Sequence, residues 1–342
     1  MLHRLGKSIG YLLLISAFAI HALVVVLFHF RWDKLAMATV FPVWLYAIAA
    51  FGILIAARFF IKTRWIPAVA IVWLITLPFL ADEATGLRNL ALGYRPVKNT
   101  EVTDLSPNAL RIITINAKSG SSQQASEIAA WNPDIVLMQE TPGHHSVRQL
   151  GQQLFGKDSV IQIHRHCTII ARGKSLRMIP MPRTPSRLPP RGIVSQLTLL
   201  DGRVLNIVNV HLDSATVKLS AWSPETWRDH ANNRRRRRES LGFMMAHETL
   251  LPDVQQGYIP TIVAGDFNAP AGDASTRMLQ NDYIDTYTVC GVGWGNTFPS
   301  GLPIHRIDQI WLDRRLDPLG LSAEKVSDTD HCMVVCDFIF RP

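Results

Sequence analysis

Four polar residues follow apolar stretches of the sequence at the points where strands of a sheet would end. They are Asn116, Glu140, His211 and Asp266. Carboxylate, amide and imidazole groups bind divalent cations and transfer protons. Because strand ends of a layered α/β domain meet at one edge of the sheet, we expect these side chains to lie close together. Each one alone is more often a cap or turn residue, so the prediction depends on the set.

One of these residues, Asp266, belongs to the segment Gly265-Asp266-Phe267-Asn268. Glycine permits tight turns, so we expect Gly265 to let the side chains of Asp266 and Asn268 reach one centre. Gly, Asp and Asn also form ordinary turns. The apolar strand before the segment and the polar residues elsewhere favour a functional site.

The elements that must position these groups are short. After residue 110, apolar runs rich in β-branched residues alternate with turns and helical patterns. The expected strands are 111–116, 134–140, 168–171, 193–199, 204–211, 261–266, 305–312 and 333–340, and the expected helices are 126–131 and 234–250. This alternation predicts an α/β domain with a sheet-based core.

The first 81 residues differ from the rest because they are mostly apolar. The runs 9–30, 35–61 and 65–81 are near or above the roughly 17 residues that a membrane-spanning helix needs. We therefore predict three transmembrane helices in 1–81, or two if the third run is re-entrant. A cleaved signal peptide is the alternative for the first run, but that run is long and two more follow it.

Basic residues predict the orientation of these helices. Arg58, Lys62 and Arg64 crowd the second connection, and Arg4 and Lys7 precede the first span. Cytoplasmic loops carry an excess of Lys and Arg. With three crossings, everything after residue 81 would lie outside the bacterial inner or plasma membrane, in the periplasm where the cell has two membranes.

The chain is basic, with a formal net charge of +8 and a pI of about 9.5. This balance favours nucleic acid, phospholipid headgroups or phosphorylated substrates as partners. Five consecutive arginines, 234–238, strengthen the hypothesis. On a helix these five residues span more than one turn, so their side chains cannot all face one binding partner. We take Arg234 and Arg238 as candidate substrate contacts and expect most of the others to be solvated.

The four cysteines contain no CxxC pair, which argues against a zinc knuckle. We expect Cys167, Cys290, Cys332 and Cys336 to be buried small residues. A disulfide is possible in principle, but Cys332 and Cys336 would lie about 13 Å apart on one strand, which is too far to bridge.

The order of the polar residues resembles the endonuclease/exonuclease/phosphatase superfamily, which includes deoxyribonuclease I and neutral sphingomyelinases. The matching pieces are Thr114-Ile-Asn116, Asp134-Ile-Val-Leu-Met-Gln-Glu140, Val208-Asn-Val-His-Leu212, Gly265-Asp-Phe-Asn268, Arg306-Ile-Asp308 and Ser327-Asp-Thr-Asp-His331. The resemblance implies a four-layer α/β (α+β) sandwich of two packed β-sheets flanked by helices over 110–342. Residues 82–109 would form a linker or a short juxtamembrane helix.

The resemblance also implies a metal site and a base. Glu140 would be the principal ligand of Mg²⁺ or Mn²⁺, and Asn116 would complete the metal site or orient the phosphate. Asp330, which precedes His331, would be a second carboxylate near the metal, with Asp328 as a minor alternative. Asp266 would be the general base that activates water.

The remaining catalytic roles follow from the same resemblance. Asn268 would hold the attacking water or a phosphate oxygen. His331, paired with Asp308, would stabilise charge in the transition state. His211 would contact the phosphate or act as a general acid, although a lone histidine on a strand is often a core residue.

Three functions remain open at this stage. A metal-dependent phosphodiesterase or nuclease fits the arginines and the basic pI. A phosphodiesterase or phosphatase acting on a lipid headgroup fits the membrane segment. A non-catalytic membrane scaffold would lack catalytic residues, and none are missing. We infer no obligate protein partner.

Overall fold

We describe the protein from a computed structural model that covers residues 2–99, 106, 108–181, 190–214, 220, 222–249, 258–270 and 272–341. The chain divides into two compact units. The first comprises Met1–Thr85 and Val217–Asn232, and the second comprises Gly86–Thr216 and Asn233–Pro342. Each unit is described separately below.

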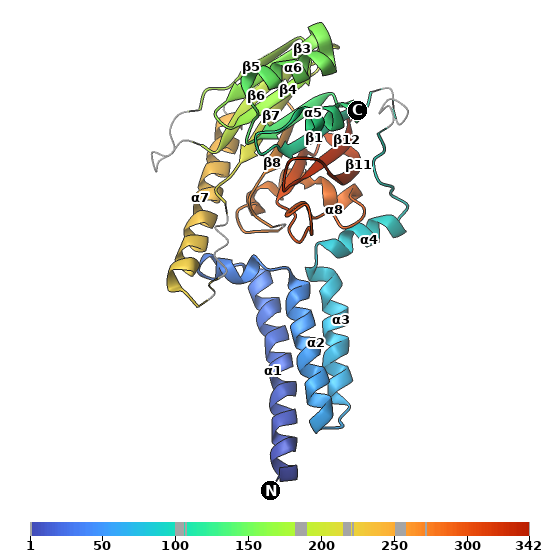
Figure 1. Ribbon diagram of the computed structural model, residues 1–342, viewed down its shortest axis with the longest axis vertical. Helices are drawn as coiled ribbons and strands as arrows, with labels where there is room; N and C mark the ends of the chain where they lie inside the picture. The colour runs from blue at the N-terminus through green and yellow to red at the C-terminus, as the bar shows by residue number, and fades with distance from the viewer. Residues whose placement is uncertain are drawn as a thin grey trace. The chain divides into compact units, whose positions relative to one another are not determined.

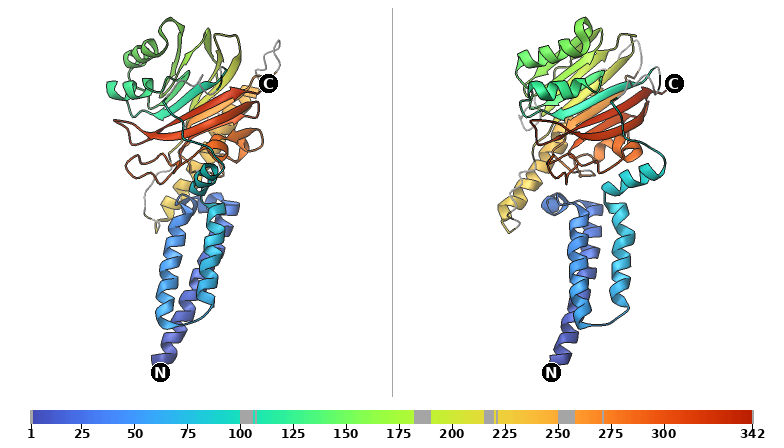
Figure 2. Two further views of the ribbon diagram at one scale, coloured as in Figure 1. Left: turned by 90° about the vertical axis from the view of Figure 1, so that its right-hand side faces the viewer. Right: turned by 45° about the vertical axis from the view of Figure 1, so that its right-hand side comes forward.

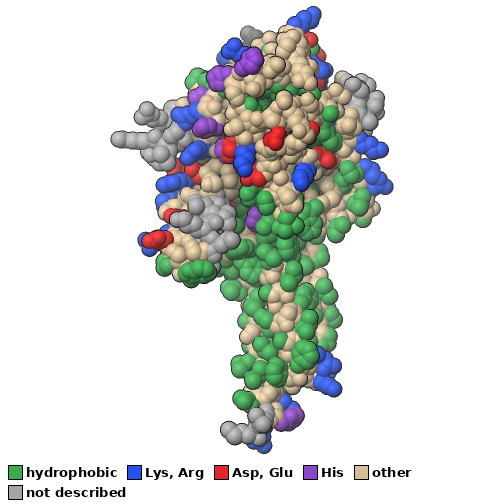
Figure 3. Space-filling model, in the orientation of Figure 1, with side chains coloured by type: hydrophobic (Ala, Val, Ile, Leu, Met, Phe, Trp, Pro, Cys, Tyr) green, Lys and Arg blue, Asp and Glu red, His purple; other side chains and the backbone are tan. Residues whose placement is uncertain are grey.

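The first unit is helical. It contains α1 (Leu2–Phe30), the short helix η1 (Asp33–Thr39), α2 (Val43–Phe60) and α3 (Trp65–Leu80). Figure 1 shows α1, α2 and α3 side by side. Small buried residues such as Ala17, Ala50 and Ala57 allow the helices to approach closely. Large apolar side chains cover the outer surface (Figure 3). A surface of this kind suits lipid.

Two helices are long and apolar enough to cross a membrane, α1 over His3–Phe30 and α2 over Val43–Phe60. The third expected span is α3, which qualifies only together with α4 (Glu83–Ala91), and these two helices are bent by 81° at the break between them. By length and composition the described residues therefore provide two spans, or three if the bent pair is one span. The count of three stays a prediction.

The second unit is built on two mixed six-stranded sheets (Figures 1 and 2). One has the order β11-β12-β1-β2-β4-β3 and the other β5-β6-β7-β8-β10-β9. The strands of the first sheet are β1 (Leu110–Asn116), β2 (Ile135–Gln139), β3 (Ser159–His164), β4 (Cys167–Arg172), β11 (Leu316–Lys325) and β12 (Cys332–Phe340). The strands of the second are β5 (Ser175–Met178), β6 (Gly192–Thr198), β7 (Val204–His211), β8 (Thr261–Asp266), β9 (Tyr283–Asp285) and β10 (Asp308–Asp313).

Alternating apolar side chains explain why the sheets stack. Ile112 and Ile207 belong to the core between the sheets, whereas their neighbours Ile113 and Val208 face outward. Helices α5 (Ser122–Ala129) and α6 (His144–Phe155) cover the outer face of the first sheet. Helix α7 (Pro224–Thr249) covers the outer face of the second through its residues after Asn233. The four-layer sandwich expected from the sequence is confirmed.

Several expected boundaries are wrong. Helix α7 begins at Pro224 rather than at residue 234, and α5 begins at Ser122 rather than at 126. The strand expected at 305–312 begins at Asp308. Strands β3, β5, β9 and β11 and the helices α6 and α8 (Thr286–Cys290) were not expected. All four cysteines are buried and free.

Candidate active site

The register of the sheets brings the predicted residues together. Asn116 ends β1, Glu140 follows β2, and these two strands are parallel. In the other sheet, His211 at the end of β7 pairs with Asp266 at the end of β8. Asp266 also pairs with Asp308, the first residue of the antiparallel strand β10. His331 directly precedes β12, which is antiparallel to β1. All these strand ends therefore lie at one edge of the sandwich.

A cavity of about 420 Å³ lies at this edge. Seven of the eight expected catalytic and metal-binding residues line it, namely Asn116, Glu140, His211, Asp266, Asn268, Asp330 and His331. The eighth, Asp308, contacts the ring of His331. The cavity is thus lined mainly by side chains that can transfer protons or bind cations and phosphate oxygens.

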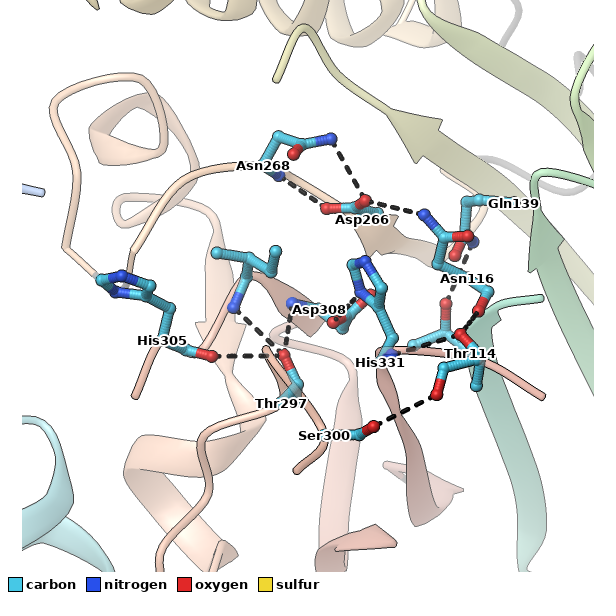
Figure 4. Close-up of polar contacts among 12 residues, drawn as sticks. Thr114, Asn116, Gln139, Asp266, Asn268, Thr297, Ser300, His305, Asp308 and His331 are labelled. Carbon is cyan, nitrogen blue, oxygen red and sulfur yellow. Dashed lines mark hydrogen bonds and ion pairs between the residues drawn. The ribbon is translucent and has the colours of Figure 1, made fainter. Parts of the chain in front are cut away.

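Asp266 is held in place on both of its carboxylate oxygens (Figure 4). Asn116 Nδ2 and Asn268 Nδ2 each donate to Oδ2 at 3.1 Å, and the backbone N–H of Asn268 donates to Oδ1 at 2.8 Å. Burial, with the charge of Asp308, raises the pKa of Asp266 to about 7. Asp266 is thus a fixed carboxylate whose proton affinity suits a base near neutral pH.

Glu140 presents its carboxylate to the cavity from a left-handed backbone conformation, with φ of +46°. Its side chain is 44% exposed, so solvent reaches the carboxylate. Asn116 Nδ2 donates to Glu140 Oε1 at 3.2 Å as well as to Asp266. A single amide therefore fixes both carboxylates. Non-glycine residues rarely adopt positive φ, and such strain is common at functional sites.

His331 and Asp308 form a buried pair (Figure 4), with His331 Nδ1 2.9 Å from Asp308 Oδ2. Burial lowers the pKa of His331, but the charge and hydrogen bond of Asp308 outweigh it and raise the pKa to about 9. The imidazole is therefore cationic at neutral pH. Thr329 Oγ1 accepts from His331 N and donates to Asn116 O, which ties this segment to β1.

The pKa of His211 is shifted in the opposite direction from that of His331. Its Nε2 lies 3.8 Å from both Glu140 Oε1 and Asp266 Oδ2. Burial lowers the pKa of His211, although the charge of Glu140 opposes this shift. A neutral imidazole donates or accepts one hydrogen bond at each nitrogen but is a poor general acid at neutral pH.

Gly265, which we expected in a turn, lies in a strand. It lies inside β8 with φ of +137°, and a Cβ at this position would lie 2.1 Å from Val210 O on β7. The expected turn at Gly265 is therefore wrong. Glycine is needed here because two backbones approach closely, and the left-handed residue after the strand is Asn268, with φ of +48°.

A buried polar network beneath the cavity was not expected from the sequence. Gln139 Nε2 donates to Asn209 Oδ1 at 2.7 Å and to Thr114 Oγ1 at 3.1 Å. Asn209 Nδ2 in turn donates to Met138 O and Thr168 O. These bonds join β2 of one sheet to β7 of the other. A signal was present, because Gln139 ends the apolar strand β2 and Asn209 interrupts the apolar residues of β7.

Two cations at the cavity were also missed. Lys118 Nζ lies 3.3 Å from Asp330 Oδ2, and Arg191 Nη2 lies 3.1 Å from Asp213 Oδ1. Lys118, Arg191 and Asp213 come from segments that connect strands, where no periodic pattern marks a residue as functional. Asp330, expected near the metal, is thus a half-exposed residue with a lysine partner.

Two of the five arginines in the run, Arg234 and Arg237, are structural. Arg234 has no exposed surface and forms an ion pair with Asp273 at 2.8 Å. Arg237, three residues later on the same face of α7, is buried and donates to Asp213 O. Arg238 is half-buried and does not line the cavity. The expectation that Arg234 contacts substrate is therefore wrong, because this side chain is enclosed by its own domain.

Two sets of groups can be compared as cation sites. Asp266, Asp308 and His331 offer ligand atoms within 4.8 Å of one another, but all three are buried and Asp308 is already bound to His331. The carboxylate of Glu140 instead lines the cavity beside Asn116 and is exposed to solvent. Oxygen donors of this kind suit Mg²⁺ or Mn²⁺. Glu140 is therefore the better centre of a metal site.

Of two similar solved structures, the one with a TM-score above 0.5 supports the fold. TDP2 of Caenorhabditis elegans is 15% identical, with a TM-score of 0.51, over 68% of this chain and 98% of that one. A mannosyl-6-phosphatase of Bacteroides thetaiotaomicron is 18% identical, with a TM-score of 0.49, over 68% of this chain and 100% of that one. A search by sequence among curated proteins finds no match.

A family model described as "Endonuclease/Exonuclease/phosphatase family" matches residues 113–331, nearly two-thirds of the chain. The match includes every catalytic and metal-binding residue expected above. Members of this family are hydrolases that act on phosphoester bonds. The chain belongs to the endonuclease/exonuclease/phosphatase family.

Proposed function

We propose that this protein is a membrane-anchored, divalent-metal-dependent phosphodiesterase that hydrolyses its substrate by attack of water on phosphorus. The observation that carries the proposal is the environment of Asp266. This carboxylate is buried at the cavity, fixed by Asn116 and Asn268, and has a pKa raised to about 7 by burial and by Asp308. A group with these properties can accept a proton from water near neutral pH.

The other residues receive roles that fit their protonation. His331, cationic because of Asp308, stabilises the charge that develops on the phosphoryl oxygens. His211, with its lowered pKa, donates a hydrogen bond to a phosphoryl oxygen rather than acting as a general acid. Asn268 orients Asp266 through its side-chain amide. Lys118 and Arg191 supply positive charge at the cavity.

The cation would be Mg²⁺ or Mn²⁺, held by Glu140 with Asn116 or Asp330 as further ligands. Asn116 Nδ2 donates to both Glu140 and Asp266, which favours an orienting role for this residue over ligation. When bound, the ion supplies Lewis-acid polarisation of a phosphoryl oxygen. The residues fit such an ion because Glu140, Asn116 and Asp330 present oxygen atoms to one cavity, and Mg²⁺ and Mn²⁺ prefer oxygen ligands.

Substrate identity is tested with the full chain in detergent or nanodiscs, with Mg²⁺ or Mn²⁺. The panel should include a bis-aryl phosphodiester, DNA, RNA, inositol phosphates and phospholipids. Asp266→Asn and His331→Ala should abolish whichever activity appears, and Asp313→Asn, a buried aspartate at the far end of β10, is the matched control. Unchanged activity in both site variants would refute the assignment, and bound metal without any activity would favour a scaffold.

A lipid headgroup is the second candidate substrate. The observation that favours it is the pair of helices long and apolar enough to cross a membrane, which would keep the catalytic domain close to phospholipid. Hydrolysis of phospholipid in vesicles without hydrolysis of DNA or RNA would select this candidate. The reverse result would select a nuclease.

We also propose that the catalytic domain lies outside the cytoplasm, because the cations Arg58, Lys62 and Arg64 precede the last apolar run. Reporters fused to the C-terminus test this orientation. Alkaline phosphatase activity should be high and green fluorescence absent. The opposite pattern would place the domain in the cytoplasm.

A further inference from the structure

Helix α4 is attached to the second unit by a buried amide. Asn89 Nδ2 donates to Tyr287 O at 3.2 Å and to Gly291 O at 2.9 Å, and Asn89 has no exposed surface. Gly86 approaches the same segment so closely that a Cβ would lie 2.1 Å from Gly293 O. Residues 86–91 are therefore a fixed part of the catalytic domain.

The other side of this helix presents apolar side chains to the outside. Leu87 and Leu92 are each 69% exposed, and Leu90 is 46% exposed. Val289 and Trp294, in the segment against which α4 packs, are also exposed. We call these five residues the α4 patch. Figure 3 shows apolar side chains gathered over α4. Exposed apolar groups that gather in this way mark an interaction surface.

The composition of the α4 patch indicates the kind of partner. Trp294 provides an aromatic ring, which is typical of the membrane interface. Arg95 and Lys98 follow the helix and are exposed. Basic residues beside an apolar surface attract anionic phospholipids. A helix with a polar buried side and exposed leucines is suited to lie along a membrane surface.

The chain path limits how far the α4 patch can lie from a bilayer. Helix α3 ends at Leu80 and α4 begins at Glu83. An extended segment rises at most about 3.5 Å per residue and a helix 1.5 Å per residue, so Leu87 is within about 16 Å of Leu80 along the chain. If α3 crosses the bilayer, the patch can reach the headgroup region.

We propose that the α4 patch binds the headgroup region of the bilayer that contains the N-terminal helices, with anionic phospholipid as its partner. The proposal rests on the membrane anchor and goes beyond it, because a tether alone leaves the catalytic domain free to turn. Contact through Leu87, Leu90 and Trp294 would hold the domain in one orientation at the membrane surface.

The test uses the full chain in vesicles of phosphatidylcholine and phosphatidylglycerol. All four native cysteines are buried, so a cysteine introduced at an exposed site is labelled selectively. An environment-sensitive fluorophore is attached to Leu87→Cys, to Leu200→Cys on the exposed turn between β6 and β7, and to Ile15→Cys on the surface of α1. Lipids that carry a nitroxide near the headgroup serve as quenchers for residues 87 and 200, and lipids that carry one on the acyl chain serve for residue 15.

We expect the label at residue 87 to have blue-shifted emission and to be quenched several-fold more strongly than the label at residue 200. Equal behaviour at 87 and 200, with quenching at 15 in the acyl region, would overturn the proposal and leave the anchor intact. A blue-shifted label at 87 that lipid nitroxides do not quench would overturn it in favour of a protein partner. Absence of lipid quenching at 15 would overturn the anchor as well.

Discussion

Replacing Asp308 by asparagine should change the pH dependence of the reaction in a defined direction. Asp308 Oδ2 lies 2.9 Å from His331 Nδ1, and its charge is the main reason why the pKa of His331 is raised to about 9. Asparagine keeps the shape and can still accept a hydrogen bond, but it removes the negative charge. The pKa of His331 should therefore fall to its ordinary value of about 6.5 or below.

The size of the effect follows from these two values. At pH 8, about 90% of His331 is cationic with a pKa of about 9, against about 3% with a pKa of 6.5. If only the cation stabilises the transition state, kcat of Asp308→Asn should be about 30-fold lower at pH 8. At pH 6 most of His331 is cationic in both proteins, so this loss should nearly vanish. Asp308 also raises the pKa of Asp266, so in Asp308→Asn the base should stay ionised to lower pH, and kcat at pH 6 should equal or exceed that of the native protein.

The assay is a pH–rate profile of kcat from pH 5.5 to 9.5 with whichever phosphoester the protein hydrolyses. Asp313→Asn, at the other end of the same strand, controls for loss of a buried aspartate. A loss that is equal at pH 6 and pH 8, or no loss at either, would refute the role of the pair.

Other predictions concern stability and metal binding. Arg234→Ala should lower the free energy of unfolding by about 3–5 kcal/mol, measured by denaturant titration, because it breaks the buried ion pair with Asp273. Arg236→Ala, on the exposed side of the helix, should change it by less than about 0.5 kcal/mol. Gly265→Ala should destabilise by about 1–3 kcal/mol or more in the same titration, because its Cβ meets the backbone of β7. Glu140→Gln should weaken Mg²⁺ or Mn²⁺ binding in calorimetry while the melting temperature in EDTA stays near that of the native protein, and unchanged affinity would contradict its role as a ligand.

The sequence predicted the fold and the edge of the site because both depend on patterns that are local. Apolar runs that end in Asn116, Glu140, His211 and Asp266 mark strands, and parallel strands bring their ends to one edge. The same reasoning could not identify β3 or β11, whose partly buried strands carry a weaker apolar signal.

Contacts between distant segments explain most of what the sequence did not predict. Arg234 is buried because Asp273, far along the chain, neutralises it, and a run of arginines gives no sign of that partner. Lys118 and Arg191 reach the cavity from connecting segments whose course no periodicity predicts. The close approach of β7 explains Gly265 better than a turn does, and this contact exists only once the sheet has formed.

Hydrolysis in ¹⁸O-labelled water tests the central claim most directly. The full chain, with Mg²⁺ or Mn²⁺, is given a bis-aryl phosphodiester in labelled water, and the products are analysed by mass spectrometry. If Asp266 activates water for attack on phosphorus, the label should appear in the aryl phosphate, and Asp266→Asn should remove this activity while Asp313→Asn keeps it. Label in the phenol, or equal turnover by Asp266→Asn, would contradict the account.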